Sequence, residues 1–360
     1  MSECIYCASS GPFADEHAMP HLLGEFTNFP LLHDTVCKAC NEAIGQAEEQ
    51  VARSGPEAFV RRALGIGGRK GHAKVDPFQR GSSGAPPMQV RRRDPRTGLD
   101  LFWTIDPGPG DGSSPTSLSG REARQVVVIG KDGSSHPILV PDWMREPEQL
   151  HEKIRALDCE PQHIRWFADD DEYEWLRSLC SELGGTENQG PPADPVTFDG
   201  MAIEVTVTSA YFRAIAKAAF HYAISAVHDL RGDEHEFEAI RAFIRYGGDH
   251  AHFVTQERGC IMPFAVRTCG THEEMAVPDV FDGQPWSYCH VCALDSDRND
   301  LTARVQFFYG PGYRPPVYVV RMGEHPRIPR LEGAAHAFIY YPGGRRGRYS
   351  GQAFHLEELR

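Results

Sequence analysis

The sequence predicts an α+β protein in which a small cysteine-rich module precedes a longer region of mixed helices and strands. Two CxxC pairs fall within the first 50 residues, which indicates a small metal-stabilised unit. Beyond them, helical and strand-like periodicities alternate without an internal repeat. Of the 360 residues, 41% are hydrophobic and 24% are charged, as in an ordinary globular protein with enough apolar surface for a core.

Changes in composition give the expected domain boundaries. The first module spans 1–70, because a glycine-rich stretch over 65–71 should end the helix before it. Residues 71–190 form a basic, Gly/Pro-rich connector and an intermediate α+β region, and the stretch 187–195 is typical of a linker. Residues 191–360 form a C-terminal α+β domain, to which we assign recognition of a target or partner.

Hydrophobic periodicity predicts the individual elements. A helix over 46–64 is expected to break at Gly55-Pro56. Further helices are expected over 146–158, 172–183, 210–230 and 234–246, and the helix over 210–230 has the clearest apolar stripe. Strands are expected over 88–92, 99–105, 125–129, 201–208, 252–254, 260–266, 286–294, 303–309, 316–322 and 337–341.

The four N-terminal cysteines have the spacing of a structural zinc site. Cys4 and Cys7 form one CxxC pair and Cys37 and Cys40 form another. Two thiolates three positions apart converge when the backbone turns between them, so each pair is typical of a zinc knuckle. Two knuckles supply four thiolates to one tetrahedral Zn²⁺, with no coordination position left open for water.

The sequence indicates neither export nor membrane insertion. Met1–Cys7 has no basic start and no apolar core of a signal peptide, and no apolar run reaches about eighteen residues. We therefore expect a cytoplasmic protein, in which ten cysteines favour metal ligation or buried thiols over disulfides. Cys289 and Cys292 do not predict a second zinc site, because positions i and i+3 of a strand face opposite ways.

A second motif lies between the two knuckles. It reads Asp15-Glu16-His17-x2-Pro20, followed by Leu22-Leu23-Gly24, and Asn41 directly follows Cys40. Over residues 3–50 this order resembles the HNH nuclease family, in its branch with CxxC, (D/E)H-x2-P, LG and CxxCN. The resemblance implies a ββα-metal module, two strands and a helix around one catalytic metal ion, with a long C-terminal portion as in bacterial HNH-bearing proteins.

These residue types suit phosphodiester hydrolysis. Histidine side chains in general change charge near neutral pH, so His17 is the expected general base for the attacking water. Glu16 offers a hard oxygen ligand for a catalytic Mg²⁺ or Mn²⁺ ion, and Asp15 is an alternative ligand. The resemblance implies that Asn41 is the second ligand; an N-cap role at the start of a helix is the structural alternative.

The chain departs from the family pattern at two places. The family usually has a central Asn that orients the base, whereas the matching stretch here reads Leu32-His33-Asp34. His33 is therefore the nearest catalytic counterpart, and Asn28 is a weaker one. A glycine pair is also common after the family's leucine, and this chain has Gly24-Glu25 instead. A zinc-folded but inactive module is consistent with both departures.

Charge is distributed unevenly along the chain. The formal net charge is −13, which by itself argues against a nucleic-acid partner. Residues 1–50 contain one Lys/Arg and eight Asp/Glu, whereas residues 51–100 contain eleven Lys/Arg and four Asp/Glu. The basic segment is either a phosphate-binding surface or a solvated charged face. Its expected phosphate contacts are Arg61, Arg62, Arg69, Lys70, Arg91, Arg92 and Arg93.

The sequence therefore favours a DNA endonuclease with a structural zinc and a catalytic Mg²⁺ or Mn²⁺ ion. RNA is an alternative substrate, and no membrane partner is expected. The competing hypothesis is a catalytically inactive, zinc-stabilised protein that binds or senses nucleic acid on an HNH scaffold. Oligomeric state and target sequence are not predicted.

Overall fold

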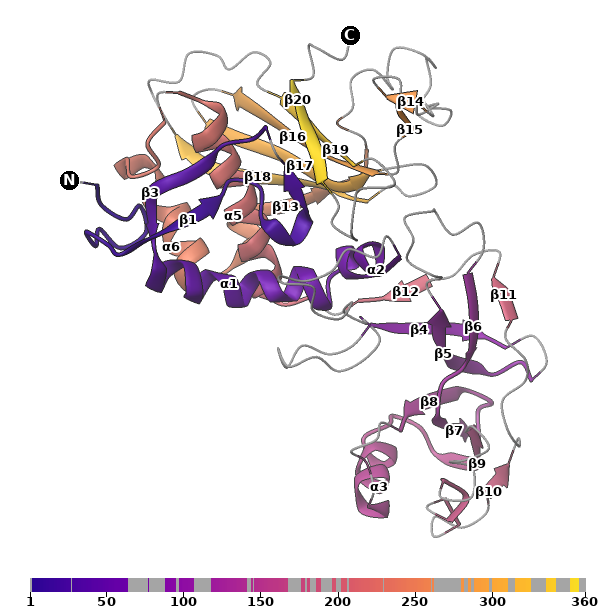
Figure 1. The fold of residues 1–360 in the computed structure, drawn as a ribbon. Coiled ribbons are helices and arrows are strands. Elements are labelled where there is room, and N and C mark those ends of the chain that lie inside the picture. Colours follow the sequence, from indigo (N-terminus) through magenta and orange to yellow (C-terminus); the bar gives the residue numbers. More distant parts are fainter. Residues whose placement is uncertain are drawn as a thin grey trace. The chain divides into compact units, whose positions relative to one another are not determined.

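The chain forms two compact units, which interrupt each other along the sequence (Figure 1). The first unit comprises Met1–Pro86, Pro109–Ser114 and Thr206–Arg360, and the second comprises Pro87–Gly108 and Pro115–Val205. The computed structural model describes residues 2–26, 28–63, 77, 88–94, 97–106, 118–140, 144, 146–167, 176–178, 180–181, 186–188, 196–198, 202–205, 207–228, 230–259, 261, 280–281, 284–285, 288–297, 300–309, 315–324, 335–340 and 350–355.

The first unit begins with two antiparallel strands and a helix. Strand β1 (Phe13–His17) pairs with β3 (Leu31–Cys37), and η1 (His21–Leu23) and the short β2 (Glu25–Phe26) lie between them in sequence. Helix α1 (Lys38–Arg53) follows β3 directly, and α2 (Pro56–Ala63) follows α1. The predicted break at Gly55-Pro56 is confirmed. The helix before it starts at Lys38 rather than near 46, because the Cys37 sulfur accepts a hydrogen bond from the Cys40 amide and caps it.

A seven-stranded sheet dominates the rest of this unit. Its strand order is β13-β18-β17-β16-β19-β20-β2, and every pairing is antiparallel except that of β2 with β20. Strand β2 of the N-terminal segment therefore forms one edge of the C-terminal sheet. The remaining bounds are β13 Val254–Glu257, β14 Val280–Phe281, β15 Gln284–Pro285, β16 Tyr288–Asp297, β17 Asp300–Tyr309, β18 Val317–Glu324, β19 Ala335–Tyr340 and β20 Ser350–His355.

Helix α5 (Ser209–Ala226) lies at the centre of the first unit. Thirteen of its 18 residues are buried, so it is enclosed on nearly all sides and is not an amphipathic surface helix. It packs against α1 on one side and against β16, β17 and β18 on another, and α6 (Glu238–Tyr246) contacts both α5 and β18. The 3-10 helices η3 (His235–Phe237) and η4 (His250–His252) flank α6 in sequence.

The N-terminal module and the C-terminal sheet share one hydrophobic core. Ile44 and Val36 belong to the same buried cluster as Phe220, Phe243 and Val305. The sequence-based division into 1–70, 71–190 and 191–360 differs from this arrangement, because it assigns the two ends of the chain to separate domains. Composition marks linkers, but it carries no information on which distant segments pack together.

The second unit contains two sheets. One has the order β11-β6-β5-β4-β12 and the other β10-β9-β7-β8, and α3 packs in the core of the latter. The Gln125 side chain accepts from the Phe102 amide at 2.8 Å and donates to its carbonyl at 2.9 Å, which joins the sheets. The bounds are β4 Gln89–Arg93, β5 Asp100–Asp106, β6 Leu118–Glu122, β7 Gln125–Gly130, β8 Ser135–Leu139, α3 Pro147–Arg155, β9 Pro161–Phe167, β10 Thr186–Asn188, β11 Val196–Phe198 and β12 Ala202–Glu204.

Most predicted elements are present, with local differences at their ends. The strand expected over 201–208 is only Ala202–Glu204, because Thr208 caps α5 by accepting from the Ala210 amide. The strand expected over 252–254 starts at Val254, after a 3-10 turn. Most of 260–266 lies outside the described residues. Among the helices described, none combines the length and apolar character needed to cross a membrane.

A buried carboxyl group connects α2, α5 and β18. Glu57 is 2% exposed, and the Tyr211 hydroxyl lies 2.9 and 3.0 Å from its two carboxyl oxygens. The Tyr318 hydroxyl contacts both Tyr211 and Glu57. Burial raises the pKa of Glu57 from its ordinary value of 4.5 to about 7, although the tyrosine hydrogen bonds partly oppose this shift.

We predict that Glu57 makes the folded state less stable as pH rises from 4.5 to above 7. In this interval folded Glu57 keeps a proton that the unfolded chain has released, so unfolding releases a proton. The loss in unfolding free energy should reach about 3 kcal/mol, from the difference between the ordinary pKa of 4.5 and the folded-state pKa of about 7. Urea unfolding at several pH values should show this slope, and Glu57→Gln should flatten it. The exposed Glu49→Gln is the control; parallel profiles for wild type and Glu57→Gln would contradict the prediction.

Candidate metal centre

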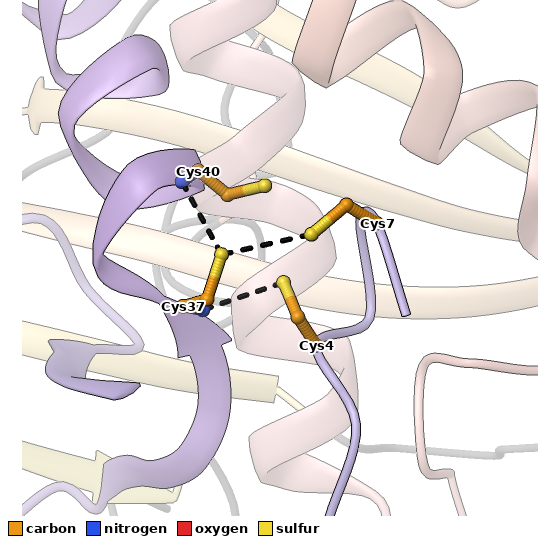
Figure 2. A group of neighbouring side chains, drawn as sticks. All are labelled: Cys4, Cys7, Cys37 and Cys40. Atoms are coloured by element: carbon orange, nitrogen blue, oxygen red, sulfur yellow. Dashed lines mark hydrogen bonds between the residues drawn. The ribbon is translucent and has the colours of Figure 1, made fainter. Parts of the chain in front are cut away.

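The four N-terminal cysteines converge at one point, as their spacing predicts (Figure 2). Cys4 and Cys7 flank a turn in which the amides of Cys7 and Ala8 donate to the Cys4 carbonyl. Cys37 is the last residue of β3, and Cys40 lies in the first turn of α1. The two knuckles therefore come from an N-terminal turn and from a strand–helix junction.

The geometry of these thiols fits one tetrahedral metal ion. All four sulfur atoms lie within 4.8 Å of one another, and the Cys7 and Cys37 sulfurs are 3.6 Å apart. Four sulfurs about 2.3 Å from a central zinc would be separated by about 3.8 Å. All four are free thiols. Among the described residues, no other group of three or more His, Cys, Asp or Glu side chains could hold a metal ion.

Hydrogen-bond donors surround the sulfurs and would stabilise thiolates. The Cys37 amide donates to the Cys4 sulfur at 3.3 Å, and the Cys40 amide donates to the Cys37 sulfur at 3.5 Å. Arg245 donates from Nε to the Cys40 sulfur at 3.3 Å. Burial raises the pKa of the Cys37 thiol, but the Cys40 amide and the neighbouring thiols outweigh it, so the pKa is lowered overall.

Helix α6 therefore supports the four-cysteine cluster from the C-terminal part of the chain. Arg245 contacts Cys40, and one turn earlier Arg241 donates from Nη1 to the Ile5 carbonyl inside the first knuckle at 2.5 Å. Donors that hydrogen-bond to a metal's ligands, or to the backbone beside them, hold those ligands in position. In the sequence, the only trace of this role is the i, i+4 spacing of two arginines on one helix face.

Glu16 is buried and ion-paired. It is 6% exposed, and the Lys217 ammonium donates to its carboxylate at 2.6 Å. The same ammonium donates to Glu48 of α1 at 2.6 Å. Burial lowers the pKa of Lys217, but the charges of Glu48 and Glu16 outweigh burial and raise it overall. The lysine therefore carries a full positive charge between two carboxylates, and sequence reasoning did not identify it as part of this site.

A neutral histidine extends this buried network. The Tyr6 hydroxyl lies 2.8 Å from Nε2 of His221, one turn after Lys217 on α5. Burial, reinforced by the Lys217 charge, holds the pKa of His221 well below its ordinary value. Burial and the Glu16 charge hold the pKa of Tyr6 well above its ordinary value. The imidazole and the phenol therefore form a hydrogen bond between two uncharged groups.

Glu16 and His17 are neighbours on β1, and neighbouring residues of a strand point to opposite sides. Glu16 is directed at α5, whereas His17 is half-buried and its ring lies 5.5 Å from that of His21. Asp15, the alternative ligand, is exposed and accepts from Nδ1 of His33 at 2.9 Å. His33 is thus paired across the β1–β3 ladder.

Asn41 lies in the first turn of α1 and is half-buried. It does not cap the helix, because α1 begins at Lys38 and Cys37 is the N-cap residue. Asn28 is exposed in the connection between β2 and β3. The alternative role of Asn41 as a helix N-cap is therefore wrong, whereas its role as a metal ligand stays a prediction.

His290 anchors the loop that follows His17. Its Nδ1 accepts from the Phe308 amide and its Nε2–H donates to the Leu23 carbonyl, both at 2.9 Å. Burial lowers the pKa of His290 to about 3, so the imidazole stays neutral. His290 therefore links β16 to the N-terminal module through neutral hydrogen bonds.

The predicted phosphate-binding residues do not share one environment. Arg61 is 5% exposed and donates from Nη1 to the Ala52 carbonyl at 2.7 Å, near the end of α1. Its position does not support the predicted phosphate contact. Arg62, Arg91 and Arg92 are half-buried and Arg93 is exposed, whereas Arg69 and Lys70 lie outside the described residues. Arg61 and Arg62 belong to the first unit, and Arg91–Arg93 to the second.

No protein-family model matches the chain, and neither a curated protein nor a solved structure matches it. The resemblance of residues 3–50 to the HNH family therefore stays a prediction. The chemistry of the site has to be argued from its own residues.

We predict that the four-cysteine cluster binds one zinc ion that stabilises the first unit. Elemental analysis of purified protein should find about one zinc per chain, and Cys37→Ser should remove it because three thiolates no longer close the site. Loss of the ion should also lower the unfolding midpoint, since metal-binding free energy contributes to folding. Cys159→Ser, which changes a thiol of the second unit, should alter neither property. Full zinc content in Cys37→Ser would contradict the assignment.

Proposed function

We propose that this protein is a metal-dependent endonuclease that hydrolyses phosphodiester bonds in DNA. The observation that supports this best is the position of Glu16 and His17 on β1. They precede a strand–helix element that carries the second knuckle of the four-thiol cluster. The antiparallel pair β1–β3 followed by α1 has the order of elements that the HNH resemblance implies.

The residues of this chain would divide the chemistry between them. His17, half-buried and next to His21, would take the proton from the attacking water. Glu16 and Asn41 would hold a Mg²⁺ or Mn²⁺ ion through oxygen atoms, the ligand type such ions prefer. When bound, this ion would stabilise charge on the phosphate and the leaving oxygen. A four-thiolate zinc has no open position, so it would serve the fold and not the reaction.

One observation favours a second function, that of a catalytically inactive protein that binds or senses nucleic acid. The Glu16 carboxylate is buried and already compensated by Lys217, with Glu48 on the other side of the ammonium. A carboxylate in this state is not an open metal ligand. Glu16 is not one of the four residues of the cysteine cluster, so such a protein would keep the zinc without using Glu16 to cut.

We predict that purified protein nicks supercoiled plasmid in Mg²⁺ or Mn²⁺ and that His17→Ala reduces the rate at least about 100-fold, because a positioned general base contributes about 10² or more. Mild EDTA treatment should stop cutting while zinc remains bound, and Mn²⁺ should restore it. His228→Ala, which changes an exposed histidine beyond α5, is the matched control. If no divalent ion supports cutting of DNA or RNA by protein that still binds nucleic acid, the inactive binding protein is the better description.

We predict that nucleic-acid binding weakens with rising salt concentration and that Arg93 contributes to this dependence. Arg93 is the exposed member of the arginine cluster on β4. If it contacts a phosphate, Arg93→Gln should reduce the slope of log K against log salt by up to about 0.9, through one less released counterion. Fluorescence anisotropy with a labelled duplex at several salt concentrations measures this slope. Arg231→Gln, at an exposed arginine paired with Asp233, is the control; equal slopes for all three proteins would mean that Arg93 only solvates the surface.

A further inference from the structure

Lys217 occupies the kind of position that a metal ion takes between carboxylates. Its Nζ lies 2.6 Å from an oxygen of Glu16 on β1 and 2.6 Å from an oxygen of Glu48 on α1. The lysine side chain is 1% exposed, so the ammonium is withdrawn from water and its charge is compensated by these carboxylates. The fold brings these three side chains together from β1, α1 and α5.

We propose that Lys217 is an internal cation that competes with a divalent metal ion for Glu16. The inference rests on the proposed function for the identity of the metal site and extends it to the control of that site. Two cations drawn to one carboxylate repel each other, and the repulsion is strong where water is excluded. Metal binding at Glu16 therefore requires that the Lys217 ammonium withdraw from it.

Glu48 makes this withdrawal feasible. An ammonium left alone in the interior would be strongly destabilised. When Lys217 leaves Glu16, it keeps the carboxylate of Glu48 as its partner. The Glu48 side chain is 18% exposed and that of Glu16 is 8% exposed, so the second carboxylate lies nearer to solvent. The lysine thus has two states, bridging both carboxylates or bound to Glu48 alone, and only the second frees Glu16.

Among the described residues, the ion pairs of Lys217 are those with Glu16 and Glu48. His221 and Tyr6, which lie in the same network, are held neutral by burial. Because Lys217 belongs to α5, the availability of Glu16 depends on a helix that is enclosed by α1 and the C-terminal sheet. Lys217 is in this sense a positioning residue that acts on the metal through Glu16.

Direct Mn²⁺ binding to the full-length protein, without nucleic acid, tests this inference by electron paramagnetic resonance. Lys217→Met removes the competing charge and should bind Mn²⁺ at least ten-fold more tightly than wild type. Adding Glu16→Gln to Lys217→Met should abolish the gain. Lys131→Met, which removes an exposed lysine paired with Glu160 in the second unit, should bind as wild type does. Zinc content and circular dichroism verify the fold of each variant.

Glu48→Gln provides an independent test at a less buried position. Without the second carboxylate, Lys217 has Glu16 as its remaining charged partner, so Mn²⁺ binding should weaken several-fold relative to wild type. Equal Mn²⁺ affinity in wild type and Lys217→Met, including no binding to either, overturns the inference. Unchanged or tighter binding by Glu48→Gln also overturns it.

These outcomes are separable from those of the proposed function. Tighter Mn²⁺ binding by Lys217→Met, with no cutting by any variant, would support the inference and contradict the nuclease. Cutting that requires His17, with the same Mn²⁺ affinity in wild type and Lys217→Met, would support the nuclease and contradict the inference.

Discussion

The ion pairs of Lys217 are the interaction on which the arrangement of the first unit depends. They join residues that are 201 and 169 positions apart in the chain, and the Lys217 and Glu16 side chains are only 1% and 8% exposed. Removing one residue of a buried ion pair leaves the other charge without compensation, which strongly destabilises the folded state. The position of α5 and the position of the Glu16-His17 strand are therefore tied to each other, and the N-terminal module is part of a larger core.

Four further contacts also tie the N-terminal module to the C-terminal part of the chain. Arg245 and Arg241 of α6 reach the Cys40 sulfur and the Ile5 carbonyl, so the metal centre is supported by the C-terminal part of the chain. His290 binds the Leu23 carbonyl, and β2 extends the seven-stranded sheet. A zinc ion at the four thiols would thus stabilise a knuckle, a strand–helix junction and a helix from the other end of the sequence together.

The two functions considered for this fold differ in what they require of one carboxylate. A nuclease needs Glu16 to be available to a divalent ion, whereas a binding protein can keep it in the ion pair with Lys217. The zinc-like centre, the core and the network of Tyr6 and His221 are compatible with both. Under the proposed competition, what would separate them is the ease with which Lys217 transfers to Glu48, which is a difference in electrostatic free energy and not in fold.

The sequence by itself determined the features that arise from neighbouring residues. CxxC spacing predicted the cluster of Cys4, Cys7, Cys37 and Cys40, the Gly55-Pro56 pair predicted a helix break, and periodicity predicted most strands. Only the tertiary structure decided that Glu16 faces a buried lysine and that Arg61 is buried against the end of α1. Burial and charge compensation depend on partners contributed by distant segments, and local periodicity carries no information about which segments those are.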